Sequence, residues 1–248
     1  MRSEQACRIE YDAWHIKHAV DIESNTPWHT MLKAKLDPQR DLANRRILDI
    51  GCGRGGFAVW LAQQPATPKE VVGCDFSPAA VSKAREYAAT NAFGGIRWEV
   101  ADIQSLPQFA DGEFDTVSST ETIEHVPDPP LAVRQLARVL KPGGRLFLTT
   151  PNYFGLSGLY RAYCVARGRT FDEGGQPICQ WTMLHRTKRW IRRAGLRILH
   201  SDSKGIYLPV PGWQSGLHLP WLEHPRWLMK RFGVHSLVIA EKPIRVGS

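Results

Sequence analysis

A glycine-rich turn is the feature of this sequence that most clearly suggests chemistry. It reads Asp49-Ile-Gly-Cys-Gly-Arg-Gly55 and separates an apolar run at residues 46–50 from a helix-like run. Glycines let the backbone turn with positive φ and approach a ligand closely, and the N-terminus of the following helix offers free N–H groups. The pattern predicts a nucleotide-like ligand at a strand–turn–helix unit. Cys52 is expected inside this turn for its small size rather than as a thiol nucleophile.

Two aspartates follow the next strand-like runs. Asp75 comes directly after residues 70–74, and Asp102 follows residues 96–100. An acid at the tip of the second strand can accept hydrogen bonds from both hydroxyls of a ribose. The alternative for Asp75 is a helix N-cap, a role for which Ser77 is better placed. Asp102 is expected to accept a hydrogen bond from the amino group of adenine, or else to stabilise a turn.

The elements that must position these residues alternate along the chain. The expected strands are residues 46–50, 70–75, 96–100, 114–118 and 145–150, and the expected helices are residues 55–64, 78–91, 104–107, 121–125 and 130–140. Such alternation predicts a parallel sheet with helices on both faces. A turn at Lys141-Pro-Gly-Gly144 is expected to end the last of these helices. Further elements are expected as a helix at 183–194 and strands at 196–202 and 236–241.

Taken together, these motifs resemble the class I S-adenosylmethionine-dependent methyltransferases. The resemblance covers roughly residues 45–150 and is carried by the glycine turn, Gly73-Cys-Asp75, Ala101-Asp102, Phe114-Asp115 and Arg138-Val-Leu-Lys-Pro-Gly-Gly144. It implies an α/β, Rossmann-like, doubly wound and mostly parallel seven-stranded sheet whose last strand is antiparallel. It also implies S-adenosyl-L-methionine as the cofactor. The cofactor contacts that it implies are Asp49, Gly51, Cys52, Gly53, Asp75, Phe76, Ala101, Asp102, Ile103, Ser119 and Thr120.

Dinucleotide dehydrogenases are the rival family for this turn. Gly51, Gly53 and Gly56 fit the glycine spacing of those enzymes. Their pattern lacks an acid two residues before the first glycine and lacks the Lys-Pro-Gly-Gly turn. The complete set of motifs therefore favours the methyltransferases.

The segment Ser119-Thr-Glu-Thr-Ile-Glu-His-Val-Pro-Asp-Pro129 resembles the ubiquinone-pathway O-methyltransferases and their relatives that act on sugars, lipids and natural products. In a helical turn, Glu121, Glu124 and His125 would share one face and form a site for a divalent ion such as Mg or Zn. The pattern also resembles the metal-binding segment of small-RNA 3′-terminal 2′-O-methyltransferases. Those relatives add a downstream histidine, where this chain has Gln176, or His185 in a different register.

Three roles stay open for the segment around His125. It is a functional metal site, or His125 acts without metal as a base or polar contact, or the segment is structural. With an ordinary pKa of about 6.5, a histidine can take the proton of a hydroxyl group near neutral pH. The expected catalytic residues are therefore His125 and Glu121.

The predicted function is methyl transfer to a hydroxyl of a small molecule, such as a phenol, quinol, sugar or lipid-linked acceptor. Three alternatives remain. They are a metal-dependent RNA 3′-terminal 2′-O-methyltransferase, an N-methyltransferase of a small molecule, and a non-catalytic protein that only binds the cofactor.

Segments outside residues 45–152 are expected to cover the site within a single domain. Residues 1–44 form a helical cap, whose face with Tyr11, Trp14, His15 and His18 either packs on the core or covers the active site. Residues 153–182 and 203–235 are expected to be lid or substrate insertions. Aromatic and basic residues alternate at 206–232, where they line an apolar substrate site, contact a membrane surface or pack on the domain.

Composition limits the partners. The chain has 248 residues and a net charge of +8, with a basic excess between residues 161 and 197. This excess is either a solvated helix face or a contact for an anionic partner. Since no nucleic-acid-binding motif accompanies it, nucleic acid is not expected as a partner, whereas peripheral membrane contact stays open. No apolar run reaches the roughly 18 residues of a membrane span, and five cysteines without CxxC spacing suggest reduced thiols and a cytoplasmic protein.

Overall fold

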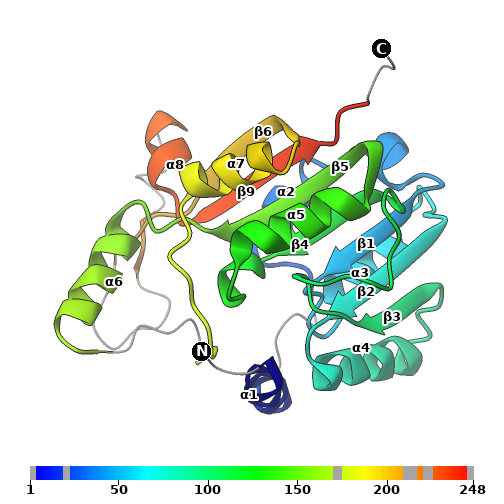
Figure 1. Cartoon of the computed structure of the whole chain (residues 1–248), viewed down its shortest axis with the longest axis horizontal. Helices are drawn as coiled ribbons and strands as arrows, with labels where there is room; N and C mark the ends of the chain where they lie inside the picture. Colours follow the sequence, from blue (N-terminus) through cyan, green and yellow to red (C-terminus); the bar gives the residue numbers. More distant parts are fainter. Residues whose placement is uncertain (1–3, 19–22, 170–174, 209–216, 220–225, 245–248) are drawn as a thin grey trace.

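A seven-stranded sheet forms the centre of the protein in a computed structural model that describes residues 4–18, 23–169, 175–208, 217–219 and 226–244 (Figure 1). The strand order is β3-β2-β1-β4-β5-β9-β6. Strand β9 is antiparallel to both of its neighbours, and the other six strands run in one direction. The strands are β1 (Arg46–Ile50), β2 (Glu70–Asp75), β3 (Ile96–Val100), β4 (Phe114–Thr120), β5 (Leu140–Pro151), β6 (Arg197–Lys204) and β9 (His235–Glu241). This arrangement confirms the predicted fold class, including the antiparallel last strand.

Helices cover both faces of the sheet (Figure 1). One core is formed with the side chains of α5 and α7, and a second core with those of α2 and α3. Helix α4 packs against β2 and β3. The helices are α1 (Glu4–Lys17), α2 (Pro27–Lys33), α3 (Gly56–Ala62), α4 (Pro78–Thr90), α5 (Pro129–Val139), α6 (Leu156–Ala166), α7 (Leu184–Arg193) and α8 (Arg226–Phe232). Shorter elements are a π-helical turn η1 (Pro38–Leu42), a 3-10 turn η2 (Ile123–His125) and the paired strands β7 (Tyr207–Leu208) and β8 (Leu217–His218).

The central strands are apolar because both of their faces are buried. Ile47 and Leu48 of β1 are fully buried, Ile47 in the core of α2 and α3 and Leu48 in the core of α5 and α7. Strands buried in this way read as continuous apolar runs rather than as alternating patterns. Because β2, β1 and β4 are neighbours that run in one direction, their carboxyl ends lie side by side. These ends carry the residues to which the sequence assigns chemistry.

The glycine turn joins β1 to α3 and packs against an aromatic side chain. Gly55 has a φ of +84°, and a Cβ atom there would lie 2.4 Å from Cη2 of Trp98. Both the backbone conformation and the available space therefore require glycine at this position. Trp98 of β3 in this way sets how closely α3 approaches the sheet.

Two predicted elements of the core are wrong or displaced. The helix expected at residues 104–107 is absent, because the carboxylate of Asp102 accepts a hydrogen bond from the Gln104 N–H at 2.8 Å and stabilises a turn instead. The helix expected at 121–125 is reduced to the 3-10 turn at Ile123–His125, because Glu121 has a left-handed φ of +46°.

Two further predictions differ in extent. Lys141-Pro-Gly-Gly144 lies within β5 rather than before it, where Gly143 has a φ of +80° and donates to the Lys242 carbonyl. The segment 153–182, for which the sequence predicted a lid or substrate insertion without a helix, contains helix α6 (Figure 1). The apolar residues of α6 were not recognised as a helix, because the sequence around them is rich in glycine.

The segments flanking the core occupy distinct places around the sheet. Helix α1 packs against α4, and α6 lies at the left of the view, far from α4 (Figure 1). Phe154, just before α6, stacks on Phe232 of α8 with ring centroids 5.7 Å apart. Much of the predicted insertion 203–235 lies outside the described residues. In the part of the chain that the structure describes, no helix is long and apolar enough to cross a bilayer.

Candidate active site

The turn after β1 is fixed by contacts to both neighbouring strands. The N–H groups of Gly51 and Cys52 donate to the Cys74 carbonyl of β2 at 2.8 and 2.9 Å. Gly51 has a φ of +76°, and a Cβ atom there would lie 2.1 Å from Oγ1 of Thr122. The turn therefore touches the segment after β4, and Thr122 is a neighbour of the site that the sequence pattern did not reveal. Cys52 is buried within the turn, as its small size suggested.

Asp75 lies at the tip of β2 and is only 8% exposed. Its Oδ2 accepts from the Gly53 N–H at 2.9 Å, and its Oδ1 accepts from the Ser77 N–H at 2.9 Å. Each carboxylate oxygen has a further lone pair, so that a carboxylate held in this way can still accept hydrogen bonds from hydroxyl groups such as those of a ribose. The N-cap of α4 is Ser77, whose Oγ accepts from the Ala80 N–H at 3.1 Å.

Asp49 connects β1 to β4 rather than standing alone in the turn. Asp49 is 1% exposed, and its register partner on β4 is Ser118. Its Oδ1 accepts a hydrogen bond from Ser118 Oγ at 2.8 Å. This bond ties the end of β1, just before the glycine turn, to β4. Ser119, the next residue of β4, is fully buried, whereas Thr120 at the strand end is partly exposed.

The segment after β3 lies beside Asp75. The Ala101 N–H donates to the Asp75 carbonyl at 2.9 Å. Ala101 and Ile103 are buried, and both belong to the core formed with α5 and α7, so that the backbone is what these two residues offer a ligand. Asp102 is half-buried, and its carboxylate also accepts from Gln104, as the turn alternative predicted.

Helix α1 covers the tip of β2. The Phe76 ring lies 4.9 Å below the guanidinium carbon of Arg8 and makes an edge contact with Tyr11 at 6.3 Å between centroids. Nε2 of His15 lies 3.9 Å from Oδ1 of Asp75, and burial lowers the pKa of this histidine. The predicted cap face therefore meets the predicted ribose residue.

Three hydrogen bonds, made by Asp12 and His15, hold α1 in this place. Asp12 accepts hydrogen bonds from the Ala79 N–H at 3.1 Å and from the Ser77 hydroxyl. Arg54 of the glycine turn donates to the His15 carbonyl at 2.6 Å. Asp12 was not identified from the sequence, since no local pattern links an acid on one helix to the N-terminus of another.

The segment after β4 places His125 in a buried position. Its Nδ1 lies 2.7 Å from the Ile178 carbonyl oxygen, and Tyr11 donates to the His125 carbonyl at 3.1 Å. A carbonyl oxygen only accepts, so that Nδ1 carries the hydrogen and Nε2 keeps a lone pair. Burial lowers the pKa of His125 to about 4. The imidazole is therefore neutral at pH 7, and the ordinary pKa expected from the sequence does not apply.

Glu124 and Glu121 take different places from those expected. Oε2 of Glu124 accepts from Thr150 Oγ1 at 2.9 Å, and its Oε1 lies 3.7 Å from Nε2 of His125. Glu121 precedes the 3-10 turn in a left-handed conformation, which a non-glycine residue adopts at a cost in energy. The three side chains therefore do not share one helical face.

These donors do not fit a metal ion. Within the described ranges, no group of three His, Cys, Asp or Glu side chains is arranged to hold one. His185 is exposed and contacts the ring of Phe154. The residue that bonds to the segment around His125 is Gln180 rather than the expected Gln176. The backbone N–H of Gln180 donates to the Glu124 carbonyl at 2.7 Å.

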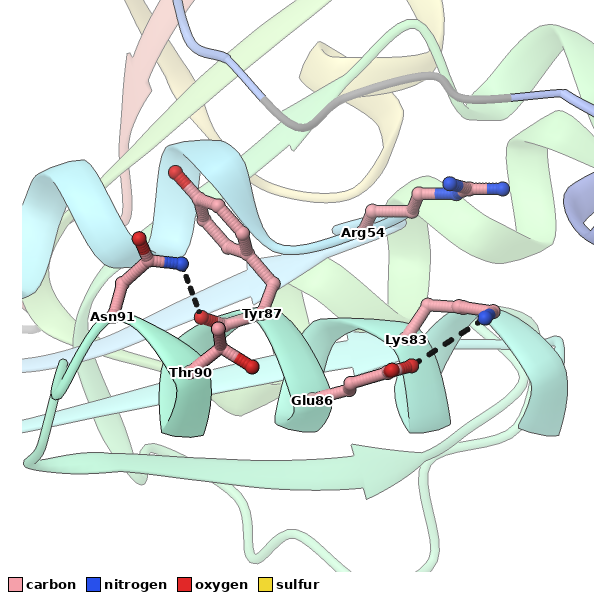
Figure 2. Close-up of a pocket in the computed structure, with 6 residues that line it drawn as sticks. All are labelled: Arg54, Lys83, Glu86, Tyr87, Thr90 and Asn91. Carbon is pink, nitrogen blue, oxygen red and sulfur yellow. Dashed lines mark hydrogen bonds and ion pairs between the residues drawn. The ribbon is translucent and has the colours of Figure 1, made fainter.

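A separate cavity of about 280 Å³ lies between the glycine turn and the outer face of α4 (Figure 2). Figure 2 shows Arg54 of the turn above Lys83 and Glu86 of α4, with the Tyr87 ring to its left. This cavity is lined mainly by the surface of α4 rather than by strand ends. The strand tips with Asp49, Gly53 and Asp75 are the better fit for an adenosyl ligand, because they combine a positive-φ turn with a fixed carboxylate.

Known proteins resemble this chain in sequence. A family model described as a methyltransferase domain matches residues 41–182. A ubiquinone biosynthesis O-methyltransferase of Xanthomonas oryzae pv. oryzae is 31% identical over 224 residues, which cover 88% of this chain and 85% of that relative.

Solved structures share the fold. A complex between the Haloferax volcanii Trm112 methyltransferase activator and a methyltransferase contains a chain that matches with a TM-score of 0.68 and 21% identity, covering 98% of this chain and 100% of that one. A S-adenosylmethionine-dependent methyltransferase from Mesorhizobium loti matches with a TM-score of 0.61 and 20% identity, covering 88% and 98%.

Proposed function

Because the chain belongs to the S-adenosylmethionine-dependent methyltransferases, we propose that it transfers the methyl group to a hydroxyl of a small phenol- or quinol-like molecule. The observation that carries the proposal is the buried, neutral His125 at the end of β4, in a chain whose relative is named an O-methyltransferase. Because the Ile178 carbonyl holds the imidazole hydrogen on Nδ1, the basic nitrogen of His125 is Nε2, which suits an acceptor that must lose a proton.

The residues of the chain have separate tasks in this proposal. S-adenosyl-L-methionine supplies an electrophilic methyl group when bound. Asp75 and the glycine turn hold the adenosyl part, and Asp49 fixes the start of the turn through its bond to Ser118 of β4. Nε2 of His125 accepts the hydroxyl proton, while Nδ1 stays bonded to the Ile178 carbonyl. No step is assigned to a metal, because the described donors do not form a metal site.

A substrate panel tests this function. The purified chain is incubated with methyl-labelled cofactor and with catechols, quinols, sugars, amines and small RNAs, each with and without EDTA. We expect label on the catechols or quinols and the same rate with EDTA. Label on RNA or amines only, or a loss of transfer with EDTA that added metal restores, would contradict the proposal.

We also propose that the enzyme contacts an anionic membrane surface through α6 and α8. Leu156, Leu159 and Tyr163 follow one face of α6 at i, i+3 and i+7, and Leu159 is 69% exposed. Trp227 of α8 is exposed as well, next to the exposed cations Lys230 and Arg231. Exposed apolar and aromatic groups beside basic residues suit the interface of an anionic bilayer.

Vesicle sedimentation tests the contact. We expect binding to phosphatidylglycerol vesicles that falls with salt, and little binding to phosphatidylcholine vesicles. Leu159→Ser should weaken binding severalfold, whereas Ile9→Ser, which removes an exposed apolar residue from α1, should not. Equal binding by the two variants would show that α6 is not the contact.

A further inference from the structure

The guanidinium of Arg161 is buried on the inner face of helix α6, the face that also carries the buried residues Gly158 and Cys164. Arg161 is 4% exposed, while its helix α6 exposes Leu159, Tyr163 and Val165. Its guanidinium carbon lies 4.6 Å from the ring centroid of Tyr153 and 4.6 Å from that of Trp181. Burying an arginine costs free energy unless its N–H donors find acceptors. The acceptors of this guanidinium therefore indicate what it does.

The guanidinium donates to two successive backbone carbonyls. Nη1 bonds to the Gln180 carbonyl at 2.9 Å, and Nη2 bonds to the Cys179 carbonyl. The planar fork of arginine suits two acceptors held at a fixed spacing, whereas the single ammonium of lysine does not. Arg161 thus fixes the segment 178–182, which has no regular secondary structure and which we call the strap.

The opposite side of the strap bonds to the active-site segment. The Ile178 carbonyl accepts from Nδ1 of His125 at 2.7 Å, and the Gln180 N–H donates to the Glu124 carbonyl at 2.7 Å. Thr182 anchors the end of the strap by donating from Oγ1 to the Pro151 carbonyl at 2.7 Å. The bond to His125 thus depends on a backbone position that lies directly beside the two carbonyls held by Arg161.

We infer that Arg161 is a positioning residue for the reaction: by holding the strap, it keeps the Ile178 carbonyl on Nδ1 of His125 and the lone pair on Nε2. The inference rests on the proposed role of His125 as proton acceptor. It gives the predicted lid a specific task, since the strap sets the tautomer of a catalytic side chain. In other enzymes, the group that fixes the tautomer of a histidine base contributes strongly to turnover.

The imidazole ¹⁵N NMR shifts of His125 test this inference directly, because they distinguish the two neutral tautomers. The His125 signals are assigned by their loss in His125→Gln. In the unmodified enzyme we expect hydrogen on Nδ1; hydrogen on Nε2 would overturn the inference without any Arg161 variant.

Arg161→Lys and Arg161→Gln then test the role of the guanidinium. We expect a mixture of tautomers and a fall in kcat on the order of tenfold, with the cofactor KM unchanged. Arg167→Gln removes an exposed arginine from the end of the same helix and should change neither quantity. His125 signals that stay on the Nδ1–H tautomer in folded Arg161 variants would contradict the inference.

The two proposals fail in different ways. A tautomer mixture without loss of kcat would leave the positioning role of Arg161 intact and would show that His125 is not the base. A loss of kcat without a change of tautomer would leave His125 as the base and overturn the role of Arg161.

Discussion

The imidazole of His125 combines burial with a hydrogen bond that fixes its tautomer. Burial lowers its pKa to about 4, although the hydrogen bond to the Ile178 carbonyl raises it, and the same bond holds the hydrogen on Nδ1. Neither property is visible in the sequence, which gave His125 as a candidate base but suggested an ordinary pKa. The role of His125 as a candidate base was predictable from its place after β4. Its environment was not predictable, because it depends on residues about fifty positions away.

The pH dependence of turnover follows from this pKa. A base with a pKa of about 4 is unprotonated throughout pH 5.5–8, so that kcat for a phenolic substrate should not fall as the pH drops from 7.5 to about 5.5. His125→Gln should lower kcat by roughly 10²- to 10⁴-fold at all these pH values. An acidic limb of the unmodified enzyme centred near pH 6.5 would contradict the buried, neutral imidazole.

At the scale of elements, the sequence predicted the βα units of the core and missed the contacts between distant segments. Helix 78–91 was predicted closely because Ser77 caps it locally. Helix α6 was missed because Gly155, Gly158 and Gly168 and several aromatic residues mask its pattern. The docking of α1 was left open, because it depends on Asp12 reaching the N-terminus of another helix.

Removing the charge of Asp12 should loosen α1. Its carboxylate accepts from the Ala79 N–H at the N-terminus of α4, where a negative charge is favourable. We expect Asp12→Asn to lower the free energy of unfolding by about 1 kcal/mol and to speed proteolysis near residue 18. Urea denaturation and limited trypsin digestion measure the two effects. Glu10→Gln, an exposed change on the same helix, is the control, and equal behaviour of the two variants would disprove the anchor.

At the scale of the whole molecule, buried histidines make the free energy of unfolding depend on pH. Burial lowers the pKa of both His29 and His125 to about 4, against about 6.5 in an unfolded chain. Between these values the unfolded chain binds protons that the folded protein does not. Stability from this source is therefore complete above pH 6.5 and is lost as the pH falls towards 4.

Chemical denaturation across this range measures the effect. Each buried histidine should contribute a slope of up to about 1.4 kcal/mol per pH unit. His29→Gln should reduce the slope between pH 4.5 and 6, and the exposed change His185→Gln should leave it unchanged. An identical slope in His29→Gln would mean that His29 is not held neutral in the fold.

Isothermal titration with S-adenosyl-L-methionine and with S-adenosylhomocysteine is the most direct test of the central claim, that the tips of β1 and β2 hold an adenosyl ligand. Asp75→Ala removes the carboxylate that the Gly53 and Ser77 N–H groups orient. We predict one site per chain in the unmodified protein and an affinity at least about tenfold weaker in Asp75→Ala, a loss of roughly 1.4 kcal/mol. Glu86→Gln, in the cavity beside α4, should bind normally. Binding that Asp75→Ala retains and Glu86→Gln loses would place the ligand in the wrong pocket and contradict the account.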